Sequence, residues 1–204
     1  LDNTPSMGAA ATTAGINTMV ANTPDQCAFA CHDTSTYPND YYGLAKRIGV
    51  TTRIDVMRTA TQQLMDTAST TQAVSNQFRM AIYTYGSSAS SRSLTTISSL
   101  TSNLSSAKTA AGNIDLMTVP YQNYDNDMDS DHDGILAGVN TAISNPGSGT
   151  TSGSPQKVLF FVSDGVADAN YTASNCSRPL YGGYRCQEPL NVAKCTAIKN
   201  RGIK

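Results

Sequence analysis

Apolar residues recur with helical spacing in the segment that begins near residue 52. The steps between them are three, seven and four residues, which keeps them on one face of a helix: Ile54, Met57, Leu64 and Ala68. Thr52 and Asp55 precede this face in a T-x-x-D pattern that is typical of a capping box at a helix start. The sequence therefore predicts an amphipathic helix from residue 53 onward.

Other helical and extended patterns alternate along the rest of the chain. We expect further helices at 41–48, at the end of 92–113, from 134 to about 143, and at 191–200. We expect strands at 78–85, at the start of 92–113, at 116–121 and at 157–163. The last of these, KVLFFVS, is a continuous apolar run and predicts a central strand buried on both faces. This alternation favours an α/β fold with an open, mostly parallel central sheet and helices on both faces.

The length of 204 residues is typical of a single domain, which we place at 1–204. Two irregular, cysteine-bearing stretches, approximately 8–40 and 166–190, are predicted to be insertions. The chain has five cysteines: Cys27, Cys31, Cys176, Cys186 and Cys195. None is paired at C-x2-C spacing, so disulfides in an oxidising compartment are favoured over structural zinc. Because five is odd, one thiol is free or pairs outside this chain, and spacing leaves the pairing open.

Composition narrows the classes of function. Charged residues make up 14% of the chain, against roughly 25% in ordinary soluble domains, and Ser, Thr, Asn and Gly take their place. This surface is typical of exported proteins and predicts a periplasmic, cell-surface or extracellular location. The net charge is −1 and the sequence has no cluster of basic residues, so electrostatics gives no support to a nucleic-acid partner. No run of about 18 apolar residues is present, so we expect no membrane span within this chain.

Three segments offer oxygen ligands for a hard divalent cation. In an extended segment, Asp2, Thr4 and Ser6 would point the same way because side chains alternate with period two. An acidic loop contributes Asp133, and Asp164 follows the predicted central strand in Ser-Asp-Gly. Ligands of open α/β sheets bind at the carboxyl ends of the strands. The sequence therefore predicts a Mg²⁺ or Ca²⁺ site made by three converging loops.

These residues resemble the metal-ion-dependent adhesion site of von Willebrand factor A (vWA) domains. The matching motifs are D-x-T-x-S-M at 2–7, the acidic loop before Gly138 and Val139, and S-D-G at 163–165. In the family the middle ligand is usually Thr, and here that position falls on Asp133. The resemblance implies a Rossmann-like vWA fold whose bound metal captures an acidic group of a partner. It also implies strands before Asp2 and after Gly202, beyond both ends of this sequence.

The segments around Cys27–His32, Asp40–Tyr42 and Cys186–Lys204 resemble TadG-like tight-adherence (Flp) pilus assembly proteins. That resemblance implies a non-enzymatic binding or assembly module in pilus assembly, cell adhesion or biofilm formation. Its partner would be a pilus component or a surface ligand, and a membrane anchor would lie N-terminal to this chain. The chain shows no P-loop, G-x-S-x-G or G-x-G-x-x-G motif, so we expect no enzymatic activity.

The acidic loop also permits a different site. Asp129, Asp131 and Asp133 followed by Gly134 match the D-x-D-x-D-G opening of an EF-hand calcium loop. The twelfth position is Asn140, where an EF-hand has a bidentate Glu. The alternative hypothesis is therefore a calcium-stabilised structural surface or pilus subunit that captures no ligand through its metal.

Overall fold

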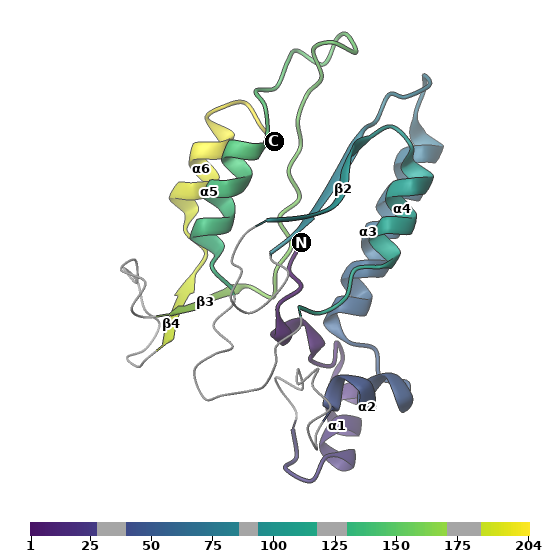
Figure 1. Ribbon diagram of the computed structural model, residues 1–204, viewed down its shortest axis with the longest axis vertical. Helices are drawn as coiled ribbons and strands as arrows, with labels where there is room; N and C mark the ends of the chain where they lie inside the picture. The colour runs from purple at the N-terminus through teal and green to yellow at the C-terminus, as the bar shows by residue number, and fades with distance from the viewer. Residues whose placement is uncertain (28–39, 86–93, 118–129, 171–184) are drawn as a thin grey trace.

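The computed structural model describes residues 1–27, 40–85, 94–117, 130–170 and 185–204. In this part of the chain there are six α-helices, one short 3₁₀-helix and two separate pairs of antiparallel strands (Figure 1). The helices are η1 (Pro5–Gly8), α1 (Thr13–Asn22), α2 (Tyr41–Arg47), α3 (Arg53–Thr71), α4 (Leu104–Gly112), α5 (His132–Ala142) and α6 (Val192–Lys199). The strands are β1 (Met80–Thr84), β2 (Thr95–Thr101), β3 (Val166–Asn170) and β4 (Arg185–Pro189).

The predicted amphipathic helix is confirmed as α3. Thr52 and Asp55 form a complete capping box, in which the Thr52 backbone amide donates to the Asp55 carboxylate at 2.9 Å. The buried face of α3 includes Ile54, Met57 and Ala68, as the spacing predicted. The predicted helices at 41–48, 134–143 and 191–200 are confirmed as α2, α5 and α6, with ends differing by one or two residues.

The predicted mostly parallel central sheet is wrong, and with it the Rossmann-like vWA fold. β1 pairs with β2 and β3 pairs with β4, both antiparallel, and the described residues form no extended parallel sheet. The apolar run 157–163 is not a strand: its backbone meets Lys204 and Asp2 through only three hydrogen bonds. Val158 and Phe160 are 56% and 59% exposed, so the run is not buried on both faces. A strand needs a neighbouring strand to which its backbone can hydrogen-bond, and an apolar sequence does not by itself provide that neighbour.

The two predicted insertions contain regular structure. Helix α1 lies within 8–40, and its cap is the Thr12 hydroxyl, which accepts from the Gly15 amide at 3.0 Å. The hairpin of β3 and β4 lies within 166–190, with Asp168 opposite Gln187. Cys31 and Cys176 lie outside the described residues, as does most of the predicted strand 116–121. The predicted disulfides therefore stay predictions.

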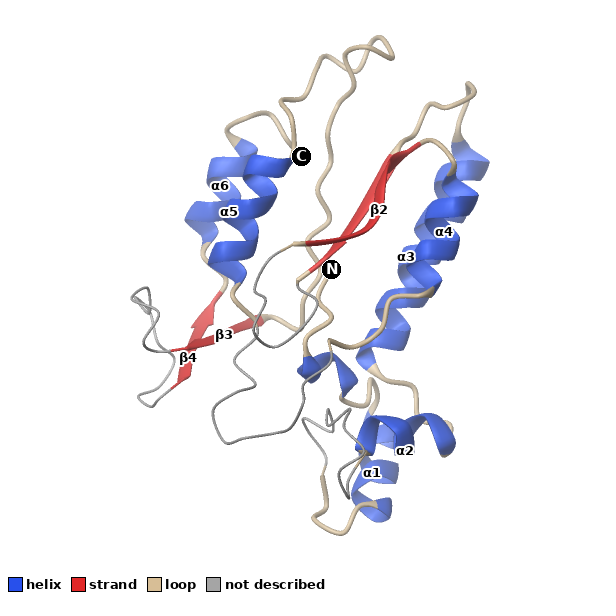
Figure 2. Ribbon diagram, in the orientation of Figure 1, coloured by secondary structure: helices blue, strands red, loops and turns tan. Residues whose placement is uncertain are grey.

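Three hydrophobic clusters replace a single sheet-centred core. The first joins α3, α4 and β1 around Ile54 and Ile82, and the second joins α1 and α2 around Met19. The third joins α5 and α6 around Leu136 and Ile198, and Phe161 packs against it. Figure 2 shows these as separate groups of helices, with the N-terminal segment between them. The candidate ligands of the N-terminal segment therefore lie where the groups meet.

Candidate functional site

The N-terminal segment is held between β1 and the 157–163 run by its backbone. The Leu1 nitrogen donates to the Tyr83 carbonyl at 2.9 Å, and the Asp2 amide donates to the Val162 carbonyl at 2.9 Å. Asn3 extends this anchoring, because its side-chain oxygen accepts from the Tyr85 amide at 3.2 Å. These bonds fix the position of Asp2 between parts of the chain more than 80 residues away in the sequence.

Four side chains form a compact group of oxygens, the Asp2 cluster: Asp2, Thr4, Ser6 and Ser130. The Thr4 hydroxyl is at its centre. It donates to Asp2 Oδ1 at 2.7 Å, and it lies 3.2 Å from the Ser6 hydroxyl and 3.1 Å from the Ser130 hydroxyl. The Thr4 amide also donates to Asp2 Oδ1 at 2.9 Å. The structure thus brings together three of the five predicted ligands and adds Ser130.

Asp2 is a buried carboxylate with one unused oxygen. The residue is 0% exposed, and Oδ2 has no hydrogen-bond partner among the described residues. Burial raises the pKa of the Asp2 carboxyl, the two hydrogen bonds from Thr4 lower it, and the nearby negative charge of Asp164 raises it. A buried carboxylate oxygen is normally satisfied, so Oδ2 is an acceptor still able to take a cation or a donor.

Ser130 takes the middle place of the cluster that the sequence assigned to Asp133. Ser130 exchanges two backbone hydrogen bonds of 3.0 Å with Asp168, which fixes its side chain toward Thr4. Asp133 lies in the first turn of α5, and its carboxylate accepts from the Asn191 side chain of α6 at 2.8 Å. The signal that could have identified Ser130 is its hydroxyl, a neutral oxygen of the same kind as those of Thr4 and Ser6.

Asp164 approaches the Asp2 cluster from the turn after the 157–163 run. Gly165 shapes this turn with φ +108°, a conformation that L side chains rarely adopt, and its amide donates to the Ser163 hydroxyl at 2.9 Å. The Asp164 side chain is 14% exposed, and Oδ2 lies 3.1 Å from Nη1 of Arg53. Sequence reasoning missed Arg53, because 111 residues separate it from Asp164.

Three aromatic rings lie together beneath these polar groups. Tyr85 stacks on Phe161 with ring centroids 5.5 Å apart, and the His132 ring meets both edge-on at 5.6 and 5.4 Å. His132 Nε2 lies 3.1 Å from the Ser163 hydroxyl. Burial lowers the pKa of His132, against the opposing effect of nearby carboxylates, and burial raises the pKa of Tyr85. Both rings are therefore uncharged at neutral pH.

The ionisable groups at this place do not balance. When ionised, Asp2 and Asp164 carry two negative charges, and Arg53 supplies one positive charge. The Leu1 ammonium beside Asp2 is a further positive group, but burial lowers its pKa to about 6, so most of it is neutral at pH 7. His132 and Tyr85 add none at neutral pH. The remaining negative charge and the unused oxygen of Asp2 fit a cation, and the hydroxyls of Thr4, Ser6 and Ser130 are the oxygen donors that Mg²⁺ and Ca²⁺ accept.

The alternative calcium loop is only partly described. Asp129 lies outside the described residues. Asp131 is the N-cap of α5 and accepts from the Gly134 amide at 3.0 Å, while Asp133 is engaged by Asn191. Both carboxylates thus serve the start of a helix and its contact with α6. In the described ranges, no three His, Cys, Asp or Glu side chains lie together as a metal-ligand group. Most of the candidate oxygen donors at the Asp2 cluster are therefore hydroxyls.

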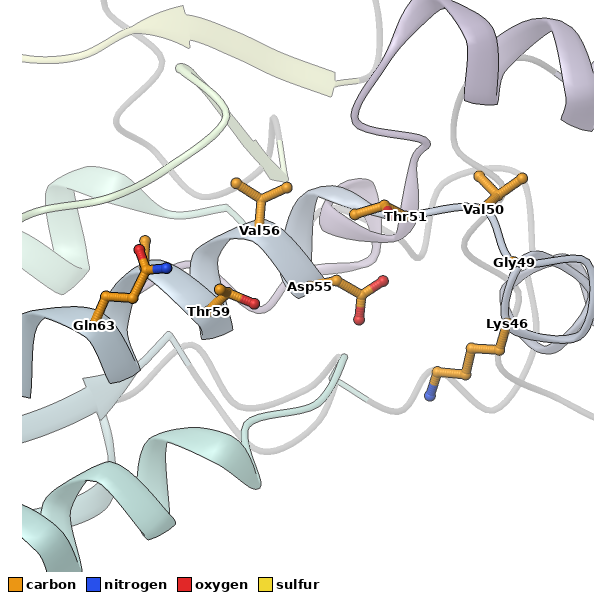
Figure 3. Close-up of a pocket in the computed structure, with 9 residues that line it drawn as sticks. Lys46, Gly49, Val50, Thr51, Asp55, Val56, Thr59 and Gln63 are labelled. Carbon is orange, nitrogen blue, oxygen red and sulfur yellow. The ribbon is translucent and has the colours of Figure 1, made fainter. Parts of the chain in front are cut away.

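A separate open pocket lies between the C-terminal end of α2 and the first turns of α3 (Figure 3). Its volume is about 620 Å³, and Lys46 and Asp55 are its charged residues. Both already have partners, because Lys46 lies over the Tyr42 ring and Asp55 caps α3 and pairs with Arg58. The pocket shares no residue with the Asp2 cluster and offers no comparable unpaired group.

Comparisons with known protein families, curated proteins and solved structures found no match for this chain. In the described part of the chain, no helix has the length and apolar character needed to cross a membrane.

Proposed function

We propose that this chain is a non-enzymatic binding module that holds a divalent cation, Mg²⁺ or Ca²⁺, at the Asp2 cluster and uses it to bind a protein partner. The observation that carries this proposal is the fully buried, unpartnered Oδ2 of Asp2 beside the hydroxyls of Thr4 and Ser130. Asp2, Thr4, Ser6 and Ser130 would hold the cation, and Asp164 would act on it directly or through water.

The donor set favours partner capture over a purely structural cation. Three of the donors, Thr4, Ser6 and Ser130, are neutral hydroxyls, so they offset little of a divalent charge. A cation held in this way keeps its attraction for a carboxylate from outside the chain. An acidic side chain of a partner protein is therefore the ligand that we expect.

The proposed setting is the surface of a bacterium. The low content of charged residues is typical of exported proteins, and the segments around Cys27–His32, Asp40–Tyr42 and Cys186–Lys204 resemble those of tight-adherence pilus assembly proteins. On this proposal the partner is a pilus component or a surface ligand. The second candidate, a calcium-stabilised structural subunit, predicts the same cation but no open position for a partner's carboxylate.

Thermal melting with a chelator, Mg²⁺ or Ca²⁺ tests the site. We expect a cation to raise the melting temperature of the wild type, because a ligand that binds the folded state stabilises it by mass action. The rise should disappear in Asp2→Asn, which keeps the shape of the side chain, and persist in the matched control Asp133→Asn. No rise in the wild type, or an undiminished rise in Asp2→Asn, would refute the proposed site.

Terbium luminescence separates partner capture from a structural role. Tb³⁺ replaces Ca²⁺ at oxygen sites, and its emission lifetimes in H₂O and D₂O report how many waters it keeps. We expect added acetate, a minimal carboxylate, to displace water from Tb³⁺ bound to the wild type. An unchanged water count would support the structural subunit and contradict partner capture.

A further inference from the structure

The Asp2 cluster has a basic side chain at its edge. Arg53 Nη1 lies 3.1 Å from Asp164 Oδ2, and within the described residues the Arg53 side chain makes no other hydrogen bond or ion pair. Among the described residues, no other Lys or Arg side chain lies within salt-bridge distance of Asp2 or Asp164. Arg53 is therefore the one basic side chain of the described residues that pairs with a carboxylate of the proposed site.

The backbone fixes Arg53 at this edge. The Arg53 amide donates to the Ala9 carbonyl at 2.9 Å, and the Ala11 amide donates to the Thr51 carbonyl at 2.9 Å. These bonds join the start of α3 to the residues that directly follow η1, in the same segment that carries Thr4 and Ser6. The backbone of Arg53 therefore keeps its place beside the Asp2 cluster, while the guanidinium, on a side chain that is 37% exposed, can turn from Asp164 to solvent.

A guanidinium and a divalent cation compete for one carboxylate. Arg remains charged at any pH at which the protein folds, so its positive charge cannot be removed by deprotonation. The Asp164 side chain is 14% exposed and the Arg53 side chain 37%, so the carboxylate is the more enclosed partner and the guanidinium lies on its solvent side. Two positive charges that share Asp164 repel each other, and each weakens the hold of the other on the carboxylate.

We propose that Arg53 is a built-in counter-ion of Asp164 that competes with the divalent cation and lowers the affinity of the Asp2 cluster for it. This inference rests on the proposed cation site and adds its regulation. When the cation is scarce, Arg53 neutralises Asp164. When the cation binds, Asp164 exchanges one positive partner for another, and the Arg53 side chain is released toward solvent.

The test is cation affinity measured by calorimetry with Mg²⁺ and Ca²⁺ on the whole chain. We expect Arg53→Gln to bind the cation more tightly by about tenfold, because one nearby positive charge is removed. Arg53→Lys keeps the charge and should stay close to the wild type. The matched control is Lys108→Gln. It also removes one positive charge from an ion pair, the one between Lys108 of α4 and Asp66 of α3 at 2.7 Å.

A second readout uses no cation. In chelator, Arg53→Gln should melt below the wild type, because Asp164 loses its counter-ion beside Asp2, whereas Lys108→Gln should melt close to the wild type because exposed ion pairs contribute little. An affinity of Arg53→Gln that equals or falls below that of the wild type, while Asp2→Asn abolishes binding, would overturn this inference and leave the proposed function intact. Absence of cation binding in wild type and Arg53→Gln alike would overturn both.

Discussion

The hydroxyl oxygen of Thr4 lies 3.1 Å from the hydroxyl oxygen of Ser130, although 126 positions separate the two residues in the sequence. Two separate sets of backbone hydrogen bonds bring them together. Thr4 follows Asp2, which is anchored to the 157–163 run, and Ser130 is bridged to Asp168 of β3. Both anchors are made of backbone hydrogen bonds, so the short distance between Thr4 and Ser130 depends on the fold. It does not depend on the carboxylates of the acidic loop before α5.

This relationship makes Ser130, and not Asp133, the expected ligand. Ser130→Ala should weaken cation binding by roughly ten- to hundredfold, the range seen when groups around a metal are lost. The control Asp133→Asn should bind the cation like the wild type, because Asp133 contacts Asn191 instead. Calorimetry with Mg²⁺ and Ca²⁺ gives both values. A loss in Asp133→Asn with no loss in Ser130→Ala would restore the original assignment.

Local patterns in the sequence predicted the helices well. The capping box of Thr52 and Asp55 and the spacing of Ile54 and Met57 lie within two turns of α3, so no distant residue was needed to find it. The strand predicted at 78–85 is confirmed as β1 over Met80–Thr84 for a similar reason. Such signals depend on the neighbours of each residue along the chain.

Long-range pairing was the part that the sequence could not supply. The run 157–163 looked like a central strand, but its backbone makes only three hydrogen bonds with the described residues, to Asp2 and Lys204, and the exposed Val158 and Phe160 show that one face is not covered. Asp133 and Ser130 are three residues apart, yet one lies inside α5 and the other before its N-cap, so their side chains diverge. The residues around Arg53 and those around Asp164 show no pattern that would predict their contact, because 111 positions separate them.

The buried carboxylate of Asp2 should reduce stability when no cation is present. Asp2→Asn removes the charge while keeping an acceptor for Thr4, and we expect it to raise the free energy of unfolding in chelator at pH 7 by about 1 kcal/mol or more. The pKa of Asp2 is raised in the folded state, so its stabilising contribution is present below the unfolded value of 3.8 and is lost as pH rises through the folded pKa. The gain in Asp2→Asn should therefore grow with pH.

Urea unfolding at several pH values measures this gain. The control is Asp66→Asn, an exposed carboxylate paired with Lys108, which should change the free energy of unfolding by less than about 1 kcal/mol. If Asp2→Asn were less stable than the wild type at every pH measured, this prediction would be wrong. The negative charge of Asp2 would then have to be stabilised by other groups of the protein.

Arg201 holds the C-terminal ends of α5 and α6 together. Its guanidinium donates to the backbone carbonyls of Asn140 and Ile143 and to the Asn145 side chain at 3.0 Å. Arg201→Met would leave these acceptors unpaired, so we expect a loss of about 2 kcal/mol in the free energy of unfolding. Lys199→Met is the control, because Lys199 is exposed on α6 and its side chain makes no hydrogen bond or ion pair with the described residues. Equal effects of the two changes in urea unfolding would argue against this role.

The pH dependence of stability should also report the burial of His132. Burial lowers its pKa in the folded state below the ordinary value of 6.5. Its contribution to stability is therefore complete above pH 6.5 and is lost as pH falls through the folded pKa, since the folded state must bind a proton less readily than the unfolded state. His132→Gln cannot bind that proton, so the difference in unfolding free energy between wild type and His132→Gln should shrink or reverse as pH falls from 7 to 5.

Urea unfolding of both proteins in chelator measures the difference at each pH. Ser163→Ala is the matched control, because it removes the 3.1 Å contact to His132 Nε2 but leaves the imidazole able to titrate. It should lower stability at pH 7 and keep the pH dependence of the wild type. A difference between wild type and His132→Gln that stays constant from pH 7 to 5 would mean that His132 takes up its proton as easily in the folded protein as in the unfolded chain. In that case the neighbouring carboxylates, Asp164 foremost, would compensate fully for burial.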